Sequence, residues 1–285
     1  HKYKPKFFAD FERNSEIIPV LQAFIQMDKL SILFVGEKGS GKTCLLHAII
    51  REYYTGYSHQ EYKDNILYIN NLMDQGINYY RNDVKIFCQT SCSIPKKKKF
   101  IVLDDIDFIN EQSQQVFRNS MDKYGKNVHF LASCNNIQKV IENLQSRFMI
   151  MKTKLLERDY ILNIMNRIIQ EEQIVMDEES KEFILCISNN NVKTVINYLE
   201  KCKLLNEPIQ YDIVVKVCTN ISFPIFEEYI RSLREKRIVR AIQILNEVAE
   251  KGYSVIDILD SFFLFVKTST HFTEDEKYNV IPVIC

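Results

Sequence analysis

Eight consecutive residues have the types and spacing needed to bind the phosphates of a nucleotide. Residues 36–43 read Gly-Glu-Lys-Gly-Ser-Gly-Lys-Thr and fill the pattern G-x-x-x-x-G-K-[ST] without a gap. The glycines let successive backbone N–H groups face one point, and the helix that follows adds its positive N-terminal end. Lys42 can reach the β- and γ-phosphates, and the hydroxyl of Thr43 can bind Mg²⁺. The predicted nucleotide-binding residues are Gly36, Glu37, Lys38, Gly39, Ser40, Gly41, Lys42, Thr43 and Cys44.

A second nucleotide-binding element lies about sixty residues downstream, as the phosphate-loop superfamily requires. The apolar run Phe100–Leu103 is followed directly by Asp104 and Asp105. Carboxylates at the end of a buried strand predict that Asp104 holds Mg²⁺ and that Asp105 polarises the attacking water. Asn135 follows the next apolar run, where its amide could hydrogen-bond the γ-phosphate or the water. Asparagine is also common in turns, so its position alone leaves both readings open.

Arg147 is a candidate for stabilising a transferring phosphoryl group. An arginine can neutralise the charge on such a group, either within its own subunit or from a neighbour. From the surrounding sequence alone, Gln-Ser-Arg-Phe, an ordinary surface arginine is the favoured interpretation.

Composition places the 285 residues among globular proteins, with 46% hydrophobic and 26% charged residues. Lys plus Arg equals Asp plus Glu at 37 each, so net charge does not identify a polyanionic partner. There is no apolar run of about 18 residues, and we expect no membrane association. The eight cysteines form no C-x-x-C pair, which argues against zinc and favours an intracellular, reducing compartment.

Alternating apolar runs and helical stretches predict an α/β domain over residues 1–152, with a parallel sheet and flanking helices. The strand signal then disappears, and helical periodicity predicts an all-α remainder, divided by a turn near Pro208 into residues 153–208 and 209–285. The expected strands are Ser31–Val35, Ile66–Ile69, Phe100–Leu103 and Val128–Ser133. The expected helices of the remainder are Glu157–Glu172, Glu178–Ile187, Val192–Leu204, Asp212–Cys218, Phe223–Arg231, Glu235–Lys251 and Ser254–Val266.

Four segments together resemble the small subunits of replication factor C, the sliding-clamp loader, within the AAA+ ATPases. The opening Lys-Tyr-Lys-Pro-Lys is similar to the family's K-Y-R-P-K, and Asn70–Arg81 to its N-A-S-D-x-R-G-I-x-x-x-R. Asp104–Asp122 resembles D-E-A-D followed by A-Q-Q-A-L-R-R-x-M-E. Ser133–Arg147 resembles the S-C-N stretch that ends in S-R-C. The resemblance implies an AAA+ ATPase domain, a small helical lid and a helical collar through which subunits associate, here incomplete at its C-terminal end.

The resemblance also implies roles for individual residues. Tyr3 and Pro5 would lie against the adenine, Asn135 would be the first sensor of the γ-phosphate, and Arg147 would be an arginine finger for the adjacent subunit's ATP. Arg81 and Lys85 would contact DNA phosphates. They are four residues apart and share a helix face, although a solvated face would look the same.

Departures from the family's pattern affect the expected activity. Asp105 stands where the family has glutamate, and its shorter side chain predicts weak hydrolysis. Lys193, at the second-sensor position, keeps the charge of an arginine but loses its forked geometry. Gln75 replaces another arginine and Phe148 replaces a cysteine. These changes fit a divergent lineage, such as that of a large DNA virus, or a subunit that binds ATP and hydrolyses it poorly.

The function implied is that of an ATP- and Mg²⁺-dependent clamp-loader subunit in a hetero-pentamer. It would help open a PCNA-like sliding clamp and place it on primer–template DNA, in the nucleus or at a cytoplasmic viral replication site. The clamp contact is expected around Arg51–Lys63. A nucleotide-binding scaffold subunit and an origin- or helicase-loading AAA+ ATPase are the alternatives. The run Lys96–Lys99 could hold DNA or form a solvated loop.

Overall fold

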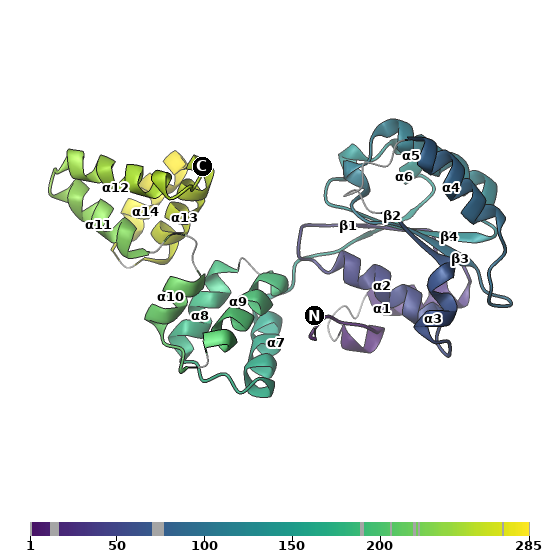
Figure 1. The fold of residues 1–285 in the computed structure, drawn as a ribbon, viewed down its shortest axis with the longest axis horizontal. Helices are drawn as coiled ribbons and strands as arrows, with labels where there is room; N and C mark the ends of the chain where they lie inside the picture. The colour runs from purple at the N-terminus through teal and green to yellow at the C-terminus, as the bar shows by residue number, and fades with distance from the viewer. Residues whose placement is uncertain are drawn as a thin grey trace. The chain divides into compact units, whose positions relative to one another are not determined.

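The computed structural model describes residues 2–11, 17–69, 77–188, 191–205, 207–218, 221, 223–269 and 271–284. The chain forms two compact units, His1–Leu155 and Leu156–Cys285 (Figure 1). The predicted three-part division at residues 152 and 208 stays a prediction. Residues 70–76 of the resembling segment Asn70–Arg81, Gln75 among them, lie outside the described residues.

The first unit is built on a five-stranded parallel sheet with strand order β2-β3-β4-β1-β5 (Figure 1). The strands are β1 Ile32–Val35, β2 Ile66–Ile69, β3 Lys99–Leu103, β4 Val128–Cys134 and β5 Met149–Lys152. The four expected strands are confirmed, and β5 was missed. Three of its four side chains are exposed, so it carries too weak an apolar pattern to be read as a buried strand.

Helices cover both faces of the sheet because alternate strand residues point to opposite sides. Ile32 and Phe34 of β1 pack into one core cluster with helices α1 and α2, whereas Leu33 belongs to the other cluster. Figure 1 shows α1–α3 on one face and α4–α6 on the other. The helices are α1 Ile17–Gln26, α2 Lys42–Tyr53, α3 His59–Tyr62, α4 Ile77–Gln89, α5 Glu111–Tyr124 and α6 Glu142–Gln145, with 3₁₀ turns η1 Phe8–Asp10, η2 Lys63–Asn65, η3 Ile106–Phe108 and η4 Ile137–Lys139.

The N-terminal segment is attached to helix α2. Phe8 is buried in the same core cluster as Leu45 and Ile49, and its backbone N–H donates to Glu52 at 2.9 Å. Arg51 donates to the carbonyl of Lys6 at 3.2 Å. Burying one large apolar side chain contributes roughly 1.5–3 kcal/mol, so Phe8 anchors the residues before it beside the helix that follows the phosphate loop.

Lys96–Lys98 form a loop before β3, as one interpretation expected, but three ammonium groups of the lysine run have partners within the unit. Lys97 donates to the carbonyl of Tyr53 at 2.7 Å, and Lys98 pairs with the carboxylate of Asp28 at 2.7 Å. Lys99 is buried and donates to Thr90 Oγ1 at 2.5 Å. These lysines therefore stabilise the start of β3 instead of forming a free cationic loop.

The second unit is helical over its described residues, apart from a single bridge between Met176 and Ile209. The helices expected from periodicity are confirmed with small shifts at their ends. Pro224 lies in the first turn of α11, and Gly252 has φ 93° just past α12, as expected. Among the described residues, no helix is long and apolar enough to cross a membrane. The helices are α7 Arg158–Glu171, α8 Glu178–Ile187, α9 Val192–Leu205, α10 Tyr211–Cys218, α11 Phe223–Arg234, α12 Ile238–Glu250, α13 Val255–Thr268 and α14 Glu274–Ile284.

Candidate nucleotide-binding site

The phosphate loop runs from the end of β1 into the start of α2 and needs glycine at defined points. Gly39 and Gly41 have φ of 90° and 86°, a region that residues with a Cβ rarely adopt. A Cβ atom on Gly36 would lie 2.3 Å from Thr153 Oγ1 and 2.4 Å from Thr153 O, so no side chain fits there. Ser40 closes the turn by donating to Glu37 O at 2.8 Å. The loop therefore leads directly into a helix N-terminus, whose first N–H groups have no partner within the helix.

Lys42, the first residue of α2, is buried and directed into the loop. Its Nζ donates to Gly36 O at 2.8 Å, to Glu37 O at 2.9 Å and to Asn135 Oδ1 at 3.0 Å. Burial lowers the pKa of Lys42, and the nearby carboxylates, Asp105 first, oppose that shift. All three of these acceptors, which lie among the described residues, are neutral.

Asp104, directly after β3, is held close to the phosphate loop. The hydroxyl of Thr43 donates to its two carboxylate oxygens at 3.2 and 3.0 Å. Ser133 of β4 donates to Asp104 Oδ1 at 2.5 Å. A hydroxyl and a carboxylate side by side are the hard oxygen donors that Mg²⁺ prefers, and Mg²⁺ sites on phosphates use only one or two protein ligands. The residues thus fit the ion, although the described residues hold no cluster of three or more His, Cys, Asp or Glu side chains.

Asp105 has a strained backbone and a perturbed carboxylate. Its φ and ψ are 52° and 53°, the left-handed region that is uncommon outside glycine. Such residues cost of order 1–3 kcal/mol and concentrate at functional sites. Burial raises the pKa of Asp105, and the charges of Asp104 and Asp107 add to that rise, while Lys42 and Asn135 oppose it.

Asn135 joins the lysine of the loop to the acidic end of β3. Its Oδ1 accepts from Lys42, and its Nδ2 donates to Asp105 Oδ1 at 3.2 Å. Asp107 fixes this residue because its Oδ2 accepts from the backbone N–H groups of Asn135 and Asn136, both at 3.1 Å. Asp107 therefore holds the backbone of Asn135, while Lys42 and Asp105 orient its side-chain amide.

Three residues of the site were not singled out from the sequence. Ser133 accepts from the backbone N–H of Asp105 at 3.0 Å while donating to Asp104. Asp107 orients Asn135, and Thr153 contacts Ser40 Oγ at 2.9 Å. Asp107 and Ser133 lie inside the resembling segments, and the available signal was that Asp107 is close to Asp105 and Ser133 is close to Asn135. Thr153 had no local signal, because it follows the strand that was missed.

Several predicted site residues lie away from this cluster. Tyr3 and Pro5 are half-buried in the segment attached to α2. Burial raises the pKa of the Cys44 thiol, and the charge of Lys4 in this segment partly opposes the rise. Arg147 contacts Asp122, Asn143 and Ser146, and none of these belongs to the phosphate cluster.

The remaining predicted cations are exposed on two helices. Arg81 and Lys85 lie one turn apart on α4, and both are exposed, whereas Val84 and Cys88 of the same helix are buried. Lys193 is exposed in the first turn of α9 in the second unit, where its backbone N–H donates to Asn191 Oδ1 at 3.0 Å.

Comparison with known families gives two matches. Residues 32–154 match the family described as "ATPase family associated with various cellular activities (AAA)". Residues 224–284 match the "Replication factor C C-terminal domain". The first match contains β1 to β5 and the site described above, and the second contains helices α11 to α14.

Individual relatives extend the likeness over almost the whole chain. The chain is 28% identical to replication factor C subunit 4 of Saccharomyces cerevisiae, over 99% of this chain and 86% of that protein. It is also 28% identical to a protein named as a replication factor C small subunit of Acanthamoeba polyphaga mimivirus, over 93% of this chain and 82% of that protein. The small subunit of Archaeoglobus fulgidus is 25% identical, over 92% and 82%.

Solved structures support the fold. A RuvB variant of Thermotoga maritima aligns with a TM-score of 0.60 at 14% identity, covering 98% of both chains. Domain III of the DnaA protein of Thermotoga maritima aligns with a TM-score of 0.53 at 14% identity, covering 72% of this chain and 90% of that one.

Proposed function

Because this chain belongs to the small-subunit family of replication factor C, within the AAA+ ATPases, we propose that it is an ATP-dependent clamp-loader subunit. Such a subunit works in a multi-subunit complex, and here it would help open a PCNA-like sliding clamp and place it on primer–template DNA. The single observation that carries the ATPase part is the convergence of Lys42, Asp104 and Asn135 at the carboxyl ends of three neighbouring strands.

ATP binding is supported by the chemistry of the loop. The N-terminus of α2 and the ammonium of Lys42 favour a polyphosphate over a neutral ligand. Thr43 and Asp104 would hold Mg²⁺, which when bound neutralises charge on the phosphate oxygens. Tyr3 and Pro5 would lie against the adenine, because Phe8 anchors their segment beside α2.

Hydrolysis requires the remaining residues to position water and sense the γ-phosphate. Asp105 would accept the proton of the attacking water, and Asn135 would bind the water or the γ-phosphate. Aspartate is one methylene shorter than the family's glutamate, and a misplacement of about 1 Å can cost about a hundredfold in rate. We therefore propose that this subunit hydrolyses ATP weakly. Lys193 would contact the nucleotide from the lid, and Arg147 would serve the ATP of an adjacent subunit.

DNA contact is proposed for the exposed face of α4. Arg81 and Lys85 present two cations one helical turn apart, which suits two phosphates of a backbone. Contacts of this kind position the protein without reading sequence, as placement at any primer end requires. The place of action would be the nucleus or a cytoplasmic viral replication site.

The alternatives are less well supported. An origin- or helicase-loading ATPase is not favoured, because the C-terminal helices match the replication factor C C-terminal domain. A scaffold subunit would bind ATP in the same way but would not hydrolyse it. Asp105, in place of the family's glutamate, is the residue that keeps this alternative open.

Clamp loading by the reconstituted complex tests the proposal. The chain is combined with its partner subunits, ATP, a labelled ring clamp and a primed circular DNA, and the clamp retained on DNA is measured after gel filtration. We expect ATP-dependent retention that Lys42→Ala reduces. Retention that is the same with and without this chain, in a complex that binds ATP, would refute the proposed function.

A further inference from the structure

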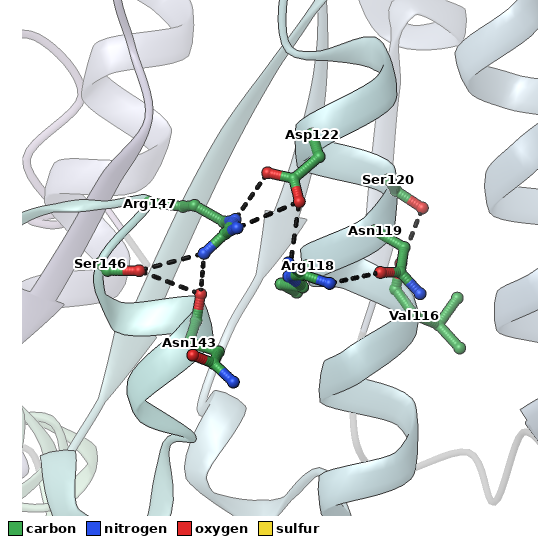
Figure 2. Close-up of polar contacts among 8 residues, drawn as sticks. All are labelled: Val116, Arg118, Asn119, Ser120, Asp122, Asn143, Ser146 and Arg147. Carbon is green, nitrogen blue, oxygen red and sulfur yellow. Dashed lines mark hydrogen bonds and ion pairs between the residues drawn. The ribbon is translucent and has the colours of Figure 1, made fainter.

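The guanidinium of Arg147 is held by its own subunit through all three of its nitrogen atoms (Figure 2). Nε and Nη2 donate to the two carboxylate oxygens of Asp122 at 2.6 and 3.1 Å. Nη1 donates to the carbonyl of Asn143 at 2.5 Å and to Ser146 Oγ at 3.1 Å. A two-pronged arginine–carboxylate contact fixes the plane of the guanidinium as well as its position.

The carboxylate that holds Arg147 lies on a well-anchored helix. Asp122 is in the last turn of α5, next to buried Met121, and Phe117 of the same helix is fully buried. Buried Gln114 ties α5 to the chain before α6, donating to Ile109 O at 2.8 Å and to Lys139 O at 3.0 Å. Arg147 itself follows the four-residue helix α6. The rigid partner in this contact is therefore Asp122.

The pair remains at the surface and remains charged. The side chains of Arg147 and Asp122 are 27% and 44% exposed, and Arg118 adds a second cation 3.4 Å from Asp122 Oδ2. The hydrogen bonds from Arg147 lower the pKa of Asp122. The two-pronged contact restricts a side chain that would otherwise sample many rotamers.

We propose that Asp122 is the positioning residue for Arg147: its carboxylate sets the guanidinium at a fixed point on the subunit surface, from which it acts on the nucleotide of a neighbouring subunit. This inference rests on the proposed function for the role of Arg147 in the neighbour's site. It adds a second residue, on a different helix, to the machinery that this subunit contributes. A guanidinium fixed in advance loses less conformational freedom when it meets the developing charge of the phosphoryl group.

The test measures ATP hydrolysis by the reconstituted complex with variants that change the charge or the length of the Asp122 side chain, alone and combined with Arg147→Ala. Asp122→Asn keeps the shape of the side chain but removes its charge, and we expect it to lower kcat for ATP hydrolysis about tenfold with the KM for ATP nearly unchanged. Asp122→Glu, which restores the carboxylate, should recover most of that loss. Asp122→Asn should cause no further loss in an Arg147→Ala background, because both changes remove the same interaction.

Three outcomes would overturn the inference: additive losses in the double variant, no effect of Asp122→Asn, or an increase in kcat, which would mean that the pair restrains Arg147. If Arg147→Ala lowers kcat while Asp122→Asn does not, only the positioning role fails. If Arg147→Ala itself has no effect, the proposed action on a neighbour fails with it. The ¹⁵Nε resonance of Arg147 in the full chain provides a second readout, since Asp122→Asn should broaden or shift it and Asp122→Glu should not.

Discussion

Asn135 accepts a hydrogen bond from Lys42 at 3.0 Å, so the end of β4 and the start of α2 are joined through the phosphate site. The same amide donates to Asp105 at 3.2 Å. A γ-phosphate bound by Lys42 would compete for the contact that Asn135 now makes. Binding of the γ-phosphate would therefore change the position of the Asn135 side chain, and Asn135 would pass that change to Asp105 at the end of β3.

Removing the ammonium of Lys42 should weaken ATP binding with little effect on the fold. Lys42→Ala deletes a charge-assisted contact worth about 1.5–3 kcal/mol, which corresponds to roughly a 10- to 150-fold loss of affinity. Isothermal titration with ATP measures this loss. Lys126→Ala is the matched control, because this exposed lysine precedes β4, at the opposite end of the parallel sheet from the phosphate loop. Equal affinities for the two variants would contradict the role of Lys42.

Lengthening Asp105 should increase the rate of hydrolysis. If Asp105 acts as the base but falls short of the water, Asp105→Glu should raise kcat about tenfold or more in the complex. Asp105→Asn keeps the shape and the left-handed backbone but should abolish activity. A scaffold subunit would show no activity with either variant, and that result would favour the alternative function. Melting temperatures of both variants exclude unfolding as the cause.

The phosphate loop should not tolerate any side chain at its first glycine. The Cβ of Gly36→Ala would approach the backbone oxygen of Thr153 to 2.4 Å, so truncating Thr153 cannot relieve the clash. We expect a loss of about 1–3 kcal/mol in the free energy of unfolding, together with loss of ATP binding.

Gly56→Ala is the control for this substitution. Gly56 has φ 93° but a Cβ there would meet nothing within 4 Å, so it tests backbone strain without a clash. It should destabilise the first unit and leave ATP affinity unchanged. Normal nucleotide binding by Gly36→Ala would show that the loop rearranges freely.

Stability of the first unit should fall between pH 6.5 and pH 4 because of His129. Burial lowers the pKa of His129 to about 4, although the hydrogen bond that its Nε2 donates to Asp28 Oδ1 opposes the shift. In this window the unfolded chain binds a proton that the folded chain does not, so folding becomes less favourable as the pH falls. The largest loss is about 3 kcal/mol.

Urea unfolding at pH 7 and pH 5 measures this effect, and His129→Asn removes the titrating group. The variant should be less stable at pH 7 but should lose less stability on acidification than the natural chain. Equal losses for the two proteins would assign the pH dependence to other groups.

The sequence was sufficient to predict those features of the fold and the site that depend on residues close together in the chain. The glycines around Lys42 and the acidic end of β3 mark the site because backbone turns and buried strands impose narrow residue requirements. The helices of the second unit were readable for the same reason, since each buries one face with a period near 3.6 residues. β5 could not be predicted from the sequence, because its side chains are largely exposed and give no apolar pattern. It is a strand because its backbone pairs with β1.

Contacts between distant segments were decided only by the tertiary structure. Ser133 bridges Asp104 and the backbone of Asp105, Thr153 closes over Gly36, and Asp122 holds Arg147 across 25 positions of sequence. Parallel strands bring their carboxyl ends together only after crossover helices have returned the chain to the same edge of the sheet. The sequence by itself determined which residues could bind a nucleotide, and the folded sheet decided which of them touch and what holds them in place.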